Sequence, residues 1–297
     1  MLLFHLSFYL RTTMKKITFL FFIFTLFIFA NTNVVVSIIP QKVFVQKIGG
    51  EKVSVTVMVG QGASPHNYQP KPSQMKAIAK ADVYFSIGVE FENVWLEKFA
   101  NQNKKMLLTD SSKSIKKHHE HHNCKHEHNE HHEKREEFDP HVWVDPLNVK
   151  IIAKNIYETL VSLDANNTNF YKQNYEAYIK ELDSVDKEIK QRLEATPKGT
   201  KFMVFHPSWG YFAKRYSLIQ LPVEVEGKEP KMKALVSIIK KAKEAKVSAI
   251  FTQPEFSDKA SKNIANNLDI AVIKASPLAE NWAENLLMLA NAIAQKK

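Results

Sequence analysis

Cysteine and arginine are both scarce in this chain of 297 residues. Its one cysteine, Cys124, excludes an internal disulfide framework and a zinc site built only from cysteines. After residue 30, only three of the 38 basic residues are arginine. Arginine forks are the side chains that best recognise bases and phosphates. Despite the net charge of +10, the scattered lysines therefore predict a solvated surface and no nucleic-acid partner.

The N-terminus lacks a hydrophobic run long enough to cross a membrane. Ile17–Ala30 follows two lysines and has fourteen residues, whereas a spanning helix needs about 20. A basic segment, a short apolar stretch and a final small residue are typical of a secretory signal peptide. We therefore predict a signal peptide over residues 1–30, with 1–13 as an over-extended start and cleavage after Ala30. No cysteine lies near this point, so a lipid anchor is not expected.

Short apolar segments alternate with amphipathic segments along the rest of the chain. This alternation predicts an α/β fold with doubly wound, mostly parallel sheets. Strands are expected at 34–39, 53–59, 83–87, 106–108, 202–205, 223–225, 247–251 and 270–273. Helices are expected at 73–80, 92–101, 208–216, 231–246, 257–267 and 280–295.

A longer periodic segment separates the two series of strands. Between Phe170 and Leu193, apolar residues recur at steps of three and four, as on one face of a helix. We predict a long rigid helix over 168–196 that joins an N-terminal α/β lobe, 31–167, to a C-terminal α/β lobe, 197–297.

Histidine is abundant in only one segment. Eight of the twelve histidines lie between residues 118 and 132, inside a stretch of Lys, Glu and His that spans 110–137. A segment so poor in apolar residues is expected to be disordered without metal. Imidazoles suit zinc, copper and nickel, so this insert is predicted to hold further, weakly bound zinc without forming the principal site.

Three histidines remain in the body of the chain: His66, His141 and His206. Each follows a predicted strand and precedes a helix, and the carboxyl ends of strands line the ligand crevice of open α/β sheets. We therefore expect the three to converge between the lobes. Three neutral imidazoles form a stable zinc shell that leaves a fourth position for a carboxylate or water. Asp139 and Asp145, beside His141, are candidates to orient its ring or to form a turn and a helix cap.

Several segments resemble zinc-binding periplasmic proteins of ABC importers. They are Gly62–Tyr68, Pro72–Ser73, Asp139–Pro146, Phe205–His206 with Gly210–Phe212, and Glu226–Pro230. The resemblance implies two α/β lobes joined by a long helix, with Zn²⁺ held between them by His66, His141 and His206. It implies a monomeric periplasmic receptor, not an enzyme, that captures zinc and delivers it to a membrane permease.

Two alternatives stay open beside this hypothesis. Manganese-preferring relatives usually have Glu where His206 stands, so His206 favours zinc over manganese or another divalent metal. A secreted zinc hydrolase also uses three histidines and a water, but the sequence has no His-Glu-x-x-His motif.

The fourth ligand is not fixed by the sequence. Relatives supply a carboxylate where this chain has Ser276, or a Glu where it has Pro65, and the second-lobe disulfide of zinc-type relatives cannot form here. Water, Glu255 and a residue of the insert are the candidates for the fourth position.

Overall fold

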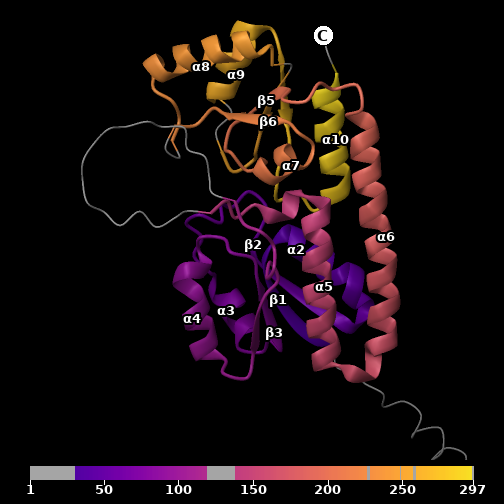
Figure 1. Cartoon of the computed structure of the whole chain (residues 1–297). Coiled ribbons are helices and arrows are strands. Elements are labelled where there is room, and N and C mark those ends of the chain that lie inside the picture. The colour runs from indigo at the N-terminus through magenta and orange to yellow at the C-terminus, as the bar shows by residue number, and fades with distance from the viewer. Residues whose placement is uncertain (1–30, 119–137, 226–227, 248, 257–258, 296–297) are drawn as a thin grey trace, which may run out of the picture. The chain divides into compact units, whose positions relative to one another are not determined.

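Two four-stranded parallel sheets organise the chain in the computed structural model (Figure 1). The structure describes residues 31–118, 138–225, 228–247, 249–256 and 259–295. The first sheet has the order β2-β1-β3-β4 and the second β6-β5-β7-β8. The strands are β1 (Thr32–Ile38), β2 (Val53–Val59), β3 (Val83–Ser86), β4 (Leu107–Asp110), β5 (Lys201–Val204), β6 (Ile219–Pro222), β7 (Ala249–Thr252) and β8 (Ala271–Lys274).

Every strand pair in both sheets is parallel, so the predicted α/β class is confirmed. The strand order reverses direction between β1 and β3 in the first sheet, and between β5 and β7 in the second. In such sheets, the loops that follow the strands diverge at the reversal point and leave a crevice at the carboxyl ends.

The described chain has nine α-helices, of which eight lie between strands and α10 follows the last strand. They are α2 (Ile39–Gly49), α3 (Pro72–Ile78), α4 (Glu92–Gln102), α5 (Pro146–Leu163), α6 (Thr168–Arg192), α7 (Gly210–Arg215), α8 (Met232–Ala245), α9 (Lys259–Leu268) and α10 (Trp282–Ala294). Asp145 begins α5 by accepting a hydrogen bond from the Leu147 N–H, and Pro146 occupies the first helical position.

The predicted long helix is α6, which has 25 residues and a length of about 38 Å. Its buried stripe includes Tyr171, Tyr178, Leu182 and Ile189, at the three- and four-residue steps expected from the sequence. Through this stripe α6 contacts α2 and α5 beside the first sheet and α10 beside the second. One helix therefore packs against elements that belong to both sheets.

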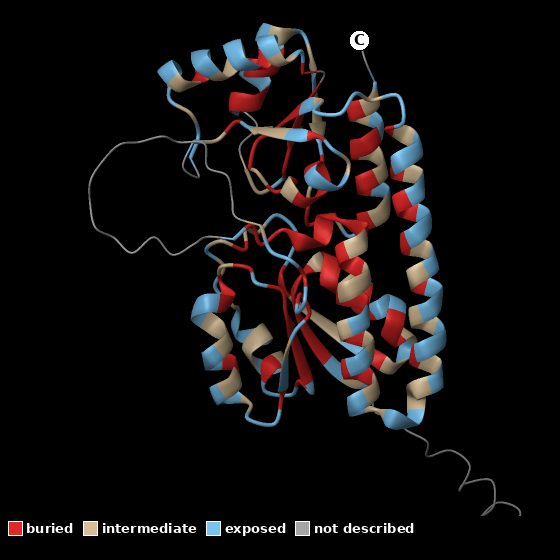
Figure 2. Cartoon of the chain, in the orientation of Figure 1, coloured by how far each residue is buried: buried red, intermediate tan, exposed pale blue. Residues whose placement is uncertain are grey.

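Two hydrophobic clusters cover the faces of the sheets (Figure 2). The larger one runs from the first sheet through α6 to one face of the second sheet, where it includes Phe202, Val204 and Phe251. The smaller one fills the other face of the second sheet beneath α8 and α9, with Phe205, Ile250 and Ile264 among its members.

One predicted strand is in the wrong place. The sequence predicts a strand at residues 223–225, whereas β6 is Ile219–Pro222 and pairs with β5, Lys201–Val204. Val223 is fully buried in the smaller cluster, which explains its strand-like pattern, but it lies beyond the strand. The next residue, Glu224, therefore belongs to the loop at the carboxyl end of β6.

The start of the predicted disordered insert is also wrong. Asp110 ends β4, and Ser111, Ser112 and Ile115 are buried. The Ser111 hydroxyl donates to the Ser86 carbonyl and accepts from the Gln41 amide, so polar residues are buried here through hydrogen bonds that composition does not reveal. Residues 119–137 lie outside the described residues.

The predicted domain boundaries stay a prediction. The described residues from Thr32 onward form one compact unit. The predicted signal peptide, 1–30, lies outside the described residues. Within the part of the chain that is described, no helix has both the length and the apolar character to cross a membrane.

Candidate metal centre

The loops that follow successive strands carry the polar residues of the site. His66 follows β2, Glu90 follows β3, and His141 lies between β4 and α5. His206 follows β5, and Glu224 follows β6. The parallel topology thus brings residues as distant in sequence as His66 and Glu224 to one region, because all these strands end at the same edge of their sheet.

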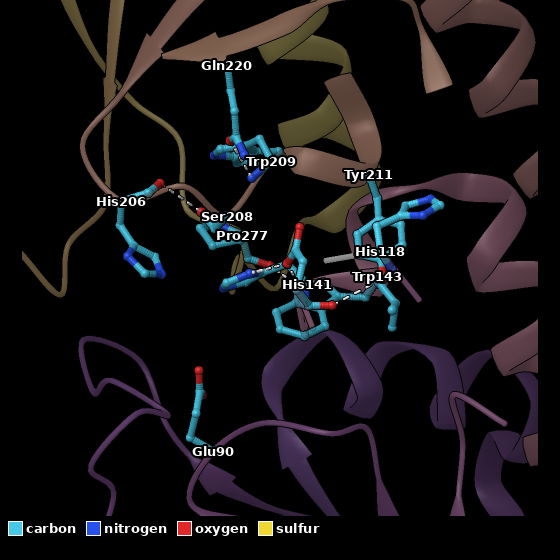
Figure 3. Close-up of polar contacts among 12 residues, drawn as sticks. Glu90, His118, His141, Trp143, His206, Ser208, Trp209, Tyr211, Gln220 and Pro277 are labelled. Carbon is cyan, nitrogen blue, oxygen red and sulfur yellow. Dashed lines mark hydrogen bonds and ion pairs between the residues drawn. The ribbon is translucent and has the colours of Figure 1, made fainter. Parts of the chain in front are cut away.

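His66 and His206 meet directly. Their Nε2 atoms are 3.1 Å apart, and their ring centroids are 4.8 Å apart. The other ring nitrogen of each bonds a carboxylate: His66 Nδ1 lies 2.9 Å from Glu90 Oε1, and His206 Nδ1 lies 2.9 Å from Glu224 Oε1. In Figure 3, Glu90 rises from the side of the first sheet and His206 descends from the side of the second.

His141 has the same kind of partner. Its Nδ1 lies 2.8 Å from Asp139 Oδ1, which also accepts a hydrogen bond from the His141 backbone N–H. Its ring centroid is 5.4 Å from that of His206 and 6.5 Å from that of His66. The three predicted histidines are therefore brought together, with His141 farther from His66 than from His206.

The hydrogen bonds of the described side chains fix the tautomers. A carboxylate accepts hydrogen bonds only, so each neutral imidazole carries its proton on Nδ1 and presents a lone pair at Nε2. Between two neutral rings these Nε2 lone pairs repel each other at 3.1 Å, and a cation between them, either a metal ion or a shared proton, removes the repulsion. Two nitrogens bound to one tetrahedral Zn²⁺ at 2.0–2.1 Å are about 3.3 Å apart. The observed separation is close to that value.

The surroundings of His206 favour its neutral form. Burial lowers the pKa of His206, and nearby His141 lowers it further, against the raising effect of Glu224. Burial raises the pKa of Glu90, but its hydrogen bond and charge interaction with His66 outweigh burial, so the pKa is lowered overall. His206 thus stays a metal-competent ligand at pH values where a free histidine begins to charge.

Elements beside the second sheet hold the partner of His141. The Tyr211 hydroxyl donates to the Asp139 carbonyl at 3.1 Å and accepts from the His118 N–H at 3.2 Å (Figure 3). The Asp139 N–H in turn donates to the His118 carbonyl at 2.9 Å. A Cβ at Gly210 would lie 2.5 Å from the Asp139 carboxylate, so a glycine is needed where α7 begins.

Asp145 bonds none of the histidines that the structure describes. It caps α5 and forms a bidentate pair with Arg215 of α7: Nε donates to Oδ1 at 3.0 Å, and Nη2 donates to Oδ2 at 2.7 Å. The cap predicted for Asp145 is therefore present, and of the two aspartates beside His141, Asp139 is the one that bonds its ring. Trp143 and Trp282 add two more connections nearby: Trp143 Nε1 donates to the Pro277 carbonyl, and Trp282 Nε1 donates to the Trp143 carbonyl.

A small cavity lies between the imidazoles. Its accessible volume of ≈ 10 Å³ is about that of one water-sized sphere, and its walls include His66, His141, His206 and Glu255. Among the described residues, no group of three or more His, Cys, Asp or Glu side chains is already gathered at metal-ligating distances. The side chains surround the space for an ion without closing fully on it.

Sequence reasoning missed Glu90 and Glu224. Glu90 lies in the short connection between β3 and α4, and the placement of a strand at 223–225 hid the position of Glu224 at a strand end. Both could have been found with the rule that was applied to the histidines, because polar residues just after strands line the crevice.

Comparison with known proteins identifies the family. The sequence model of the family described as zinc-uptake complex component A, periplasmic, matches residues 34–295. The chain belongs to this family. The resemblance found in the sequence motifs is thereby confirmed.

Individual members of the zinc-uptake component A family and related proteins are also similar. A crystal structure of ZnuA superposes with a TM-score of 0.80 at 40% identity, over 89% of this chain and 98% of that one. SloC, a metal ABC transporter substrate-binding lipoprotein of Streptococcus mutans, is 31% identical over 76% of this chain and 74% of SloC. PsaA of Streptococcus anginosus, a manganese ABC transporter substrate-binding lipoprotein, is 28% identical over the same shares.

Proposed function

We propose that this chain is the zinc receptor of an ABC importer: it binds Zn²⁺ between His66, His141 and His206 and delivers it to a membrane permease. The observation that carries the proposal is the approach of two Nε2 lone pairs to 3.1 Å, with both Nδ1 atoms committed to carboxylates. Such an arrangement favours a cation between the rings. Similarity to substrate-binding proteins of transporters supports a binding role rather than catalysis.

The chemistry of the three ligands favours zinc. Imidazole is a borderline ligand that suits Zn²⁺, Cu²⁺ and Ni²⁺, whereas Mn²⁺ prefers carboxylate and carbonyl oxygens in octahedral sites. The carboxylates of Glu90, Asp139 and Glu224 each use one oxygen to bond an imidazole Nδ1. They raise the basicity of the rings and fix their orientation.

Manganese is the second candidate, because PsaA, at 28% identity, is named a manganese protein. The two candidates differ in their expected order of affinities. A site of three imidazoles is expected to bind Mn²⁺ with the lowest affinity and to bind Ni²⁺ and Zn²⁺ far more tightly. A manganese receptor would bind Mn²⁺ with an affinity comparable to that for Zn²⁺.

Calorimetric titration of the metal-free protein with Zn²⁺, Mn²⁺ and Ni²⁺ tests the proposal. We expect one tight Zn²⁺ per chain, which is lost in a His66→Ala/His206→Ala variant and kept in a His118→Ala control. His118 is also a histidine close to the site, but it bonds Lys214 and stacks on Tyr211 instead of facing the cavity. A preference for Mn²⁺, or unchanged zinc binding in the double variant, would overturn the assignment.

The insert is tested by a deletion that spares the ordered residues before it. Because Ser111, Ser112 and Ile115 are buried, the deletion should remove only 119–137. We expect the tight zinc to remain and weaker zinc equivalents to disappear. Loss of the tight zinc would show that the insert supplies a principal ligand.

Export to the periplasm is part of the same proposal. It rests on the apolar segment Ile17–Ala30 and the lysines that precede it. Mass spectrometry of the protein recovered from its native cell should give a chain that begins at Asn31 and carries no lipid. A chain that begins at Met1 or Met14 would contradict cleavage.

A further inference from the structure

Among the described residues, Glu255 is the one carboxylate in the wall of the histidine cavity, and no bond from it to an imidazole is seen. It lies just beyond β7, in the loop at the carboxyl end of the strand, like the other residues of the site. The cavity of ≈ 10 Å³ is lined by Glu255 together with His66, His141 and His206. Glu90 and Glu224 do not line it, because they lie behind the rings that they orient.

The carboxylate of Glu255 is incompletely bonded. Its Oε2 is buried and has no hydrogen-bond partner, and its Oε1 has a long contact of 3.4 Å with the Ser276 hydroxyl. A buried carboxylate oxygen without a partner is costly, and a bound cation is one of the few groups that offsets that cost. The oxygens of Glu90 and Glu224 that lack a partner belong to carboxylates already committed through their other oxygen.

We propose that Glu255 is the fourth zinc ligand, a step that rests on the proposed zinc-binding function. Three neutral imidazoles and one carboxylate complete a tetrahedral shell and reduce the charge of the buried ion from +2 to +1. Water need not fill the fourth position. Ser276, whose hydroxyl contacts Glu255, orients this carboxylate toward the cavity instead of binding zinc itself.

Glu255 also borders a second, larger cavity. Glu255 and Ser276 line a space of ≈ 320 Å³, whose walls include Lys42, Gln61 and Glu280. In this wall Glu280 forms an ion pair of 2.7 Å with Lys42, and it does not line the histidine cavity.

The test uses the full chain with Co²⁺ and Zn²⁺. Co²⁺ reports its coordination by visible absorption, and Zn²⁺ affinity is measured by competition with a chromophoric chelator. For Glu255→Gln we expect a changed Co²⁺ spectrum and an affinity for Zn²⁺ lower by at least about tenfold, the effect that even an outer partner typically has. Glu280→Gln, which removes a carboxylate from the same larger cavity, should alter neither measurement.

A second variant separates ligand loss from misfolding. Ser276→Asp, added to Glu255→Gln, places a carboxylate beside the lost one, since the two side chains are 3.4 Å apart. We expect it to restore the zinc affinity and a spectrum of the wild-type type. If Glu255→Gln keeps the wild-type affinity and spectrum while His66→Ala/His206→Ala loses zinc, the fourth-ligand proposal is wrong and the zinc receptor stands. If the wild-type chain itself lacks a tight zinc site, the proposed function fails.

Discussion

Glu92, at the start of α4, connects the stability of the fold to the loop that carries Glu90. Its side chain is 3% exposed and accepts hydrogen bonds from the N–H groups of Ile87 (3.0 Å) and Gly88 (2.8 Å). It also bonds the Ser37 hydroxyl. Burial raises the pKa of Glu92 from 4.5 to about 7, against the lowering effect of these hydrogen bonds. A carboxyl with this pKa changes charge near neutral pH.

The sign of the effect on stability follows from proton uptake. Between pH 4.5 and 7 the unfolded chain has released the Glu92 proton, whereas the folded chain still holds it. The free energy of unfolding therefore falls as pH rises through this window, and the contribution is fully present only below pH 4.5. At ~1.4 kcal/mol per pKa unit, this carboxyl contributes a pH-dependent loss of about 3 kcal/mol above pH 7.

Replacement of Glu92 by glutamine removes this titration. Urea unfolding of the metal-free protein, followed by tryptophan fluorescence from pH 4.5 to 8, gives the free energy of unfolding of both chains. The difference between wild type and Glu92→Gln should shift by about 3 kcal/mol across that range in favour of the variant at high pH. Glu97→Gln, on an exposed position of the same helix, should show no such shift. A difference for Glu92→Gln that is independent of pH would refute the reasoning.

Three further predictions concern the contacts around His141 and α7. Asp139→Asn should weaken Zn²⁺ binding by about 10- to 100-fold, because a neutral amide supports the Nδ1 proton and the basicity of the ring less than a carboxylate does; chelator competition measures this, and unchanged affinity would contradict it. Tyr211→Phe removes one hydroxyl that bonds two backbone groups and should lower the free energy of unfolding by about 1 kcal/mol in urea, whereas no loss would show that these bonds are replaced by water. Arg215→Met leaves the buried Asp145 carboxylate without its ionic partner and should cost about 3 kcal/mol in the same assay, with Lys214→Met as a control; equal effects of the two variants would count against the pair.

The histidines could be predicted from the sequence because the relevant rule is local. His66 and His206 each follow a run of apolar residues that forms a strand, and parallel strands end at a common edge. The length of α6 could be predicted for the same kind of reason, since its buried residues recur with the period of a helix. In both cases a few neighbouring residues contain the whole signal.

The carboxylate partners could not be predicted in this way. Glu224 is 18 residues from His206, and their contact depends on the register in which β6 pairs with β5. A strand placed at 223–225 instead of Ile219–Pro222 moves Glu224 from the crevice into the sheet. The error over 110–118 has a similar origin, because Ser111 is buried by its bonds to Gln41 and Ser86, which are distant in sequence.

The position of His141 in the sequence also suggests the wrong elements as its structural support. His141 precedes α6 in sequence and so falls in the predicted N-terminal lobe, like His66. Yet Asp139, the carboxylate that bonds its ring, packs against α7. A Cβ at Gly210 would clash with the Asp139 carboxylate, and Tyr211 bonds the Asp139 carbonyl. The contacts therefore join His141 to the elements that carry His206, which agrees with ring centroids 5.4 Å apart for this pair and 6.5 Å apart for His66 and His141. His66 differs from His141 in this respect, because the carboxylate that bonds its Nδ1 is Glu90, which follows β3 of the first sheet.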